Sequence, residues 1–150
     1  IGGGLGLAMC SDFVLATEDS LFATTEVRLG IVPGVISPYI VRRIGLAHCS
    51  DFMLSGNRLN AHLASQKGIV NRVVSSSDFE KACTEVTEQF LNAGPCASRS
   101  TKELLLKISP LPDHYLFEFT ASSIARARCS PEGQAGLAAF FQKKPAPWLK

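Results

Sequence analysis

The sequence predicts an α/β fold that contains more helix than strand. Short apolar runs of strand length occur in the first half of the chain, at 12–16, 21–24 and 69–74. Segments with apolar residues at helical spacing fill most of the second half, and glycine or proline separates many of them. We therefore expect a few short strands near the N-terminal side and helices over the remainder.

Length and composition describe an ordinary globular domain. The chain has 150 residues, of which 46% are hydrophobic and 19% charged, enough for one domain or one folded part of a larger one. The net charge of +2 provides no broad basic face, so we expect no nucleic-acid partner. No run of eighteen apolar residues is present, which predicts no membrane span.

The cysteines and histidines show no metal-binding pattern. The five cysteines are odd in number and form no C-x-x-C pair, which favours isolated buried thiols in a reducing compartment such as the cytoplasm or the mitochondrial matrix. The three histidines are scattered, so we expect no metal site. The chain opens at Ile1 directly on a glycine turn, and we expect it to be part of a longer protein.

The first half should form short elements in quick succession. A buried helix is expected at 5–10 after the glycine turn, followed by a strand at 12–16 and an extended piece at 21–24. Ser37 is then expected to be the N-cap of a helix that has Pro38 at its first position and that Gly45 stops, and a second helix is expected at 47–55.

The later elements carry clear capping residues. Asn60 should cap a short helix that ends near Gly68, before a β-branched strand at 69–74. Ser77 is expected to cap a long amphipathic helix that Gly94-Pro95 ends. Further helices are predicted at 97–108 and 113–128, and Ser130 should cap the last one.

Two neighbouring motifs indicate chemistry. Glycines clustered at the start of a helix, Gly2-Gly3-Gly4-Leu5-Gly6, leave bare backbone N–H groups that can bind a developing oxyanion. Glu26 lies before the Pro33-Gly34 turn, where a single carboxylate can transfer a proton. Each motif also has a structural interpretation, the first as a tight turn with close helix packing and the second as a surface carboxylate.

Taken together, these segments resemble the enoyl-CoA hydratase/isomerase (crotonase) superfamily. The resemblance rests on the glycine turn with Cys10-Ser11-Asp12, on 22–34, on 64–70 and on the C-terminal 130–144, and extends from Gly2 to about Trp148. It corresponds to the second half of a typical member. Within the superfamily the chain looks nearest to methylglutaconyl-CoA hydratase-like members.

The resemblance implies an architecture and partners. The expected fold is the second half of a crotonase-like ββα spiral, at 1–108, followed at 109–150 by C-terminal helices that trimerise and cover the coenzyme A. Members are trimers or hexamers that bind acyl-CoA thioesters. We therefore expect a homo-oligomer with no separate cofactor, coenzyme A being part of the substrate.

The resemblance also implies site residues, carried over by position. Gly3 resembles an oxyanion donor, Glu26 the carboxylate that transfers a proton at the carbon alpha to the thioester, and Gly34 a glycine whose N–H helps to seat water. The implied substrate-binding residues are Gly2, Gly4, Gly6, Phe141 and Lys143. The chain departs from the two-carboxylate hydratases at Gly6, which stands where their first glutamate would be.

Three functions follow as expectations. The leading one is a hydratase-type lyase that adds water to a 2-enoyl-CoA, and the segment Ile36-Ser37-Pro38-Tyr39 favours it. The second is a Δ3,Δ2-enoyl-CoA isomerase that uses Glu26 alone, which Gly6 favours, because one carboxylate suffices for a 1,3-proton shift. The third is a crotonase-like subunit kept for structure without catalysis.

Overall fold

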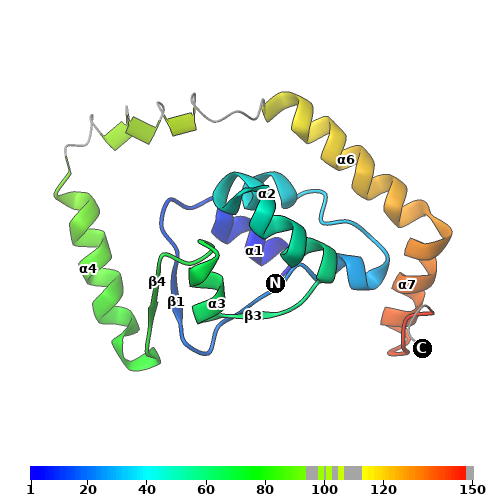
Figure 1. The fold of residues 1–150 in the computed structure, drawn as a ribbon, viewed down its shortest axis with the longest axis horizontal. Coiled ribbons are helices and arrows are strands. Elements are labelled where there is room, and N and C mark those ends of the chain that lie inside the picture. Colours follow the sequence, from blue (N-terminus) through cyan, green and yellow to red (C-terminus); the bar gives the residue numbers. More distant parts are fainter. Residues whose placement is uncertain (94–97, 100, 103–104, 107–112, 148–150) are drawn as a thin grey trace.

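The computed structural model describes residues 1–93, 98–99, 101–102, 105–106 and 113–147. Helices α1 (Gly3–Met9), α2 (Ser37–Ser55) and α3 (Ala61–Gln66) form a central body together with short strands. Helix α4 (Phe79–Leu91) lies on one side of this body, and α6 (Asp113–Cys129) and α7 (Pro131–Phe141) lie on the other (Figure 1). Of the helix predicted at 97–108, residues 98–99, 101–102 and 105–106 are described and are helical, and the rest lies outside the described residues.

Two pairs of short strands connect the first half of the chain. Strand β1 (Leu15–Thr17) runs parallel to β4 (Arg72–Val74), with Ala16 opposite Val73. Strand β2 (Leu21–Phe22) runs antiparallel to β3 (Leu59–Asn60), which the sequence did not predict. The strands predicted at 12–16 and 69–74 are both shorter in the structure. In the second of these, Ile69 and Val70 are buried in the core, and only the following residues pair with β1.

Helix α2 is broken where the sequence predicted an interruption. Gly45 has φ 71° and ψ 166°, so two helical halves meet there at a kink. Ile36 rather than Ser37 is the N-cap residue, and Gly56 ends the helix in the left-handed conformation with φ 61°. The buried side chains of this helix, Ile40, Ile44, Cys49 and Phe52, form the centre of the apolar core.

Side-chain caps define the starts of three helical segments. Asn60 Oδ1 accepts a hydrogen bond of 2.8 Å from the Leu63 N–H at α3, and Ser130 Oγ accepts one of 3.0 Å from the Gly133 N–H at α7. Both caps were predicted. Before α4 the prediction of a cap at Ser77 is wrong: Ser75 caps a short 3-10 helix, η2 (Ser76–Asp78), and the N-cap residue of α4 itself, Asp78, makes no side-chain capping bond.

The described residues lack features of some other protein classes. None of their helices is both long and apolar enough to cross a membrane. Nor do the described residues contain a group of three or more histidine, cysteine, aspartate or glutamate side chains that could hold a metal ion.

Candidate active site

Glu26 lies on a short 3-10 helix, η1 (Thr25–Leu29), which the sequence did not predict. The chain is held on both sides of this carboxylate by bonds to the end of α2. On one side the buried Thr24 Oγ1 donates to the Phe52 carbonyl at 3.2 Å. On the other, Arg28 donates to the Ser55 carbonyl at 3.4 Å and to Asn57 Oδ1 at 2.7 Å. The position of Glu26 is therefore set by the C-terminal end of a helix that follows it in the chain.

The glycine turn brings the start of α1 beside this carboxylate. The Gly2 N–H donates to the Ala23 carbonyl at 3.3 Å, which joins the turn to the segment that leads into η1. A Cβ atom on Gly2 would lie 4.0 Å from Glu26 Oε1. Gly3 and Gly4 are the first two residues of the helix, so their N–H groups have no carbonyl partner within it.

Gly3, Glu26 and Gly34 line one cavity of about 310 Å³. The remaining side chains that line it are apolar and belong to Val32, Pro33, Val35, Ile36 and Ile124. Glu26 is thus the one ionisable side chain among the described residues around this cavity. The cavity combines an apolar wall with a carboxylate and with a helix N-terminus, whose partial positive charge favours an anion.

One oxygen of Glu26 is buried and unsatisfied. Within the described residues, Glu26 Oε2 is inaccessible to solvent and has no hydrogen-bond partner. A buried carboxylate oxygen without a partner is costly, and structural carboxylates are ordinarily paired or hydrogen-bonded. A group in this state is available to accept or deliver a proton.

Gly34 differs from the expectation in one respect. It is buried and lines the cavity, but its N–H already donates to the Val32 carbonyl at 2.8 Å. Its carbonyl accepts a hydrogen bond of 3.2 Å from Ser37 Oγ. The N–H of Gly34 could therefore seat a water molecule only if its bond to Val32 opened.

None of the five other expected residues lines this cavity. Gly4 is exposed, and Gly6 is buried behind Ile36. Phe141 and Lys143 are both exposed, the first at the end of α7 and the second just beyond it, and neither lines the cavity. Gly2 stands next to Glu26 but does not line the cavity either.

Sequence reasoning did not assign five of the lining residues to the site, namely Val32, Pro33, Val35, Ile36 and Ile124. Ile36 belongs to the segment Ile36-Ser37-Pro38-Tyr39, which the sequence analysis used only as an argument for hydration. Ile124 comes from α6, almost a hundred residues after Glu26. No local pattern distinguishes Ile124 from other apolar residues of that helix. Its position follows from the C-terminal helices, since α7 packs against η1 and α6 packs against α7.

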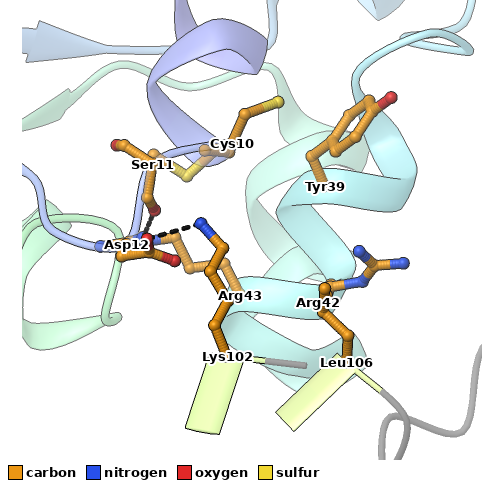
Figure 2. A pocket seen from close by; sticks show the side chains of 9 residues that line it. Cys10, Ser11, Asp12, Tyr39, Arg42, Arg43, Lys102 and Leu106 are labelled. Atoms are coloured by element: carbon orange, nitrogen blue, oxygen red, sulfur yellow. Dashed lines mark hydrogen bonds and ion pairs between the residues drawn. The ribbon is translucent and has the colours of Figure 1, made fainter. Parts of the chain in front are cut away.

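A second cavity of about 310 Å³ lies at the other end of α1 and has a basic lining (Figure 2). Its Arg43 has a structural role: the guanidinium donates to the carbonyls of Ser11 at 2.9 Å and Ile69 at 3.0 Å, and also to Asn71 Oδ1. Burial lowers the pKa of Arg43, and the nearby Asp12 carboxylate opposes that change. This side chain joins the end of α1 to the segment between α3 and β4.

The other two cations of this second cavity do not converge on a common point. Lys102 Nζ pairs with Asp12 Oδ2 at 2.6 Å, whereas the Arg42 guanidinium points away from that pair (Figure 2). A site for an anion requires donors that point at the same place. The cavity that contains Glu26 is therefore the better candidate for catalysis.

Comparison with known proteins agrees with the resemblance in the sequence. The family described as Enoyl-CoA hydratase/isomerase matches residues 1–150. A Thermus thermophilus protein named for enoyl-CoA hydratase is 31% identical over 145 residues, which are 97% of this chain and 57% of that protein. A carnitinyl-CoA dehydratase from Salmonella typhi is 31% identical over 98% of this chain and 58% of its own.

A solved structure supports the fold. The crystal structure of a carnitinyl-CoA hydratase from Mycobacterium avium is similar with a TM-score of 0.86 and 25% identity, over 98% of this chain and 58% of that one. The chain thus has a mixed α/β crotonase-like fold and spans less than three fifths of the length of the curated relatives it matches. The expected nearness to methylglutaconyl-CoA hydratases is wrong, because the similar proteins that are named for a particular acyl group are carnitinyl-CoA dehydratases.

Proposed function

The chain belongs to the enoyl-CoA hydratase/isomerase family, and from this membership we propose that it catalyses the reversible hydration of a 2-enoyl-CoA thioester. Glu26 is the group that transfers the proton, and the Gly3 N–H is a donor to the thioester oxygen. The whole protein's substrate is an acyl-CoA, with coenzyme A entering as part of it.

One observation supports this proposal above the others. The buried, unpartnered Oε2 of Glu26 belongs to a side chain that shares a cavity with Gly3. A carboxylate without a structural partner beside an open backbone donor is the pair of groups that enolate chemistry requires. The donor stabilises negative charge on the thioester oxygen, and the carboxylate exchanges a proton with the neighbouring carbon.

The reaction can run with this single carboxylate. Glu26 takes a proton from water while the water oxygen bonds to the β-carbon, and the electron pair of the double bond moves onto the thioester oxygen. The Gly3 N–H stabilises the resulting enolate. The protonated Glu26 then delivers its proton to the α-carbon, so the water molecule is added across the double bond and Glu26 returns to its charged form.

A second candidate function is Δ3,Δ2-enoyl-CoA isomerisation. Glu26 is the one ionisable side chain among the described residues that line the cavity, and a 1,3-proton shift needs no more than this. The carboxylate removes a proton from the carbon alpha to the thioester and returns it two carbons further along. Water takes no part, which suits the apolar lining.

The experiment that tests both functions uses the full-length protein with crotonyl-CoA and with 3-hexenoyl-CoA. We expect hydration of crotonyl-CoA, and a loss of at least about 100-fold in kcat for Glu26→Gln with little change in acyl-CoA affinity. Glu18→Gln, at an exposed carboxylate outside this cavity, is the matched control and should keep full activity. Rapid isomerisation without hydration would reverse the order of the two functions.

The non-catalytic subunit is the third possibility, and calorimetry tests it. If the full-length protein bound no acyl-CoA, both enzymatic proposals would fail and the structural role would stand.

We also propose a homo-oligomer, a trimer or hexamer, in which exposed apolar side chains of the C-terminal helices, such as Phe117 and Phe140, contact a second copy. Light scattering on the purified protein gives the mass that decides this.

A further inference from the structure

The side chain of Ile36 fills the space that a side chain at residue 6 would need. Gly6 is buried on α1, and a Cβ atom built there would lie 2.3 Å from Ile36 Cγ2 and 2.9 Å from Ile36 Cβ. Carbon atoms that are not bonded to each other do not approach so closely, since their attraction is greatest near 3.5–4.0 Å. Any side chain at residue 6 would therefore have to displace Ile36.

The same isoleucine forms part of the wall of the Glu26 cavity. Ile36 is 5% exposed and lines the cavity together with Gly3 and Glu26. Gly6 lies one helical turn after Gly3 on the same face of α1. Ile36 thus stands between the backbone of α1 and the space beside the carboxylate.

Ile36 is held firmly in this position. It is the N-cap residue of α2, and its carbonyl accepts a hydrogen bond of 3.2 Å from the Ile40 N–H. Its side chain belongs to the main apolar core, which also contains Leu5 of α1. A β-branched side chain fixed at its backbone and packed on the core has little freedom to move aside for a ligand.

We propose that Ile36 is a specificity-determining residue that limits the width of the acyl pocket beside Glu26, and that glycine at residue 6 exists to let it approach. The inference rests on the proposed function, because it assigns the cavity to the acyl group of a thioester. With Ile36 present, the pocket accepts an unbranched acyl chain better than a chain branched at the β-carbon. The same side chain excludes a second carboxylate at residue 6, so Glu26 is the one carboxylate among the described residues that line the cavity.

The test has two independent readouts on the full-length protein. The first is thermal unfolding of Gly6→Ala, Ile36→Ala and the double variant. Gly6→Ala alone should lower the unfolding midpoint by roughly 5 °C, because overpacking a core is destabilising. In the Ile36→Ala background the same change should cost less, because the closest approach, to Ile36 Cγ2, is removed while the approach of 2.9 Å to the Cβ atom remains. Additive effects would show that the two residues do not compete for space.

The second readout is ligand selectivity, measured by calorimetry with butyryl-CoA and isovaleryl-CoA, which cannot be hydrated. Ile36→Ala should shift the ratio of the two dissociation constants by about tenfold in favour of the branched ligand. Ile40→Ala is the matched control, because it makes the same deletion in a fully buried residue that does not line the cavity, and the ratio should stay unchanged.

The outcomes separate the two proposals. An unchanged ratio in Ile36→Ala, with both ligands still bound, would overturn the role of Ile36 and leave the proposed function intact. If neither ligand bound to the unmodified protein, the acyl-CoA function itself would fail, and the selectivity role would fail with it. The unfolding measurements would still decide whether Ile36 and Gly6 compete.

Discussion

Glu26 Oε1 lies 4.0 Å from the place that a Cβ atom on Gly2 would occupy, so the start of α1 and the carboxylate on η1 are neighbours. The two residues are brought together by the hydrogen bond from the Gly2 N–H to the Ala23 carbonyl. Gly2 adopts φ 58° and ψ −135°, a combination that is open to glycine and strained for other residues. This backbone position is therefore part of the geometry of the site.

Gly2→Ala should weaken both stability and activity. The strained backbone should cost about 2 kcal/mol of the free energy of unfolding, measured by urea denaturation. We expect kcat to fall because the turn moves relative to Glu26. Gly4→Ala is the control: Gly4 is helical with no atom near its missing Cβ, so the change should stabilise the protein by about 0.5–1 kcal/mol. Equal effects of the two substitutions would contradict this account.

Thr24→Val should loosen the anchor of η1. The variant keeps the shape of the buried side chain and removes its bond to the Phe52 carbonyl. We expect a loss of about 1 kcal/mol in the free energy of unfolding and a lower kcat with little change in KM. Thr25→Val, next along the chain, makes the same change in a half-buried residue and should have the smaller effect on stability.

Arg43→Met should destabilise the fold and leave the cavity that contains Glu26 unchanged. The variant loses the charged donor that joins the end of α1 to the segment before β4. About 2 kcal/mol of the free energy of unfolding should be lost, and Arg43→Lys should recover only part of it because an ammonium cannot reproduce the guanidinium fork. Arg58→Met, at an exposed arginine, provides the control for loss of charge.

The cysteines should differ in reactivity. Burial raises the pKa of the Cys49 thiol, whereas Cys10 and Cys129 are exposed. At pH 8 iodoacetamide should modify the two exposed cysteines and spare Cys49, as mass spectrometry would show, and denaturant should abolish the difference. Because its folded pKa is raised, Cys49 contributes stability that is present below about pH 8.5 and is lost as the pH rises further. Rapid modification of Cys49 in the folded protein would contradict its burial.

Local hydrogen bonding explains which elements could be predicted from the sequence. The caps at Asn60 and Ser130 depend on a side chain and an N–H three residues later, and the break at Gly45 depends on one residue's backbone. The cap before α4 was placed at Ser77 instead of Ser75, because both serines suit the role and only the 3-10 turn between them decides.

The site itself could be predicted only in part. Glu26 and Gly3 were singled out from motifs that the chain shares with a family, and the structure places them in one cavity. The 3-10 helix that carries Glu26 has no amphipathic repeat by which to recognise it. The contact between Gly6 and Ile36, the approach of Ile124 and the internal bond of the Gly34 N–H are tertiary features, which no local pattern encodes.

Three hydrogen bonds hold the segment around η1 to the end of α2, and two of them, from Thr24 and Arg28, end on main-chain carbonyls, those of Phe52 and Ser55. Main-chain acceptors are present whatever side chain the residue carries, whereas the third bond, from Arg28, ends on the side chain of Asn57. Point substitutions at the exposed positions of residues 51–58 other than Asn57 should therefore be tolerated with full turnover. Inserting or deleting a single residue there would move these carbonyls relative to Thr24 and Arg28 and so misplace the Glu26 carboxylate. Natural variants of this stretch should therefore differ in residue identity more often than in length.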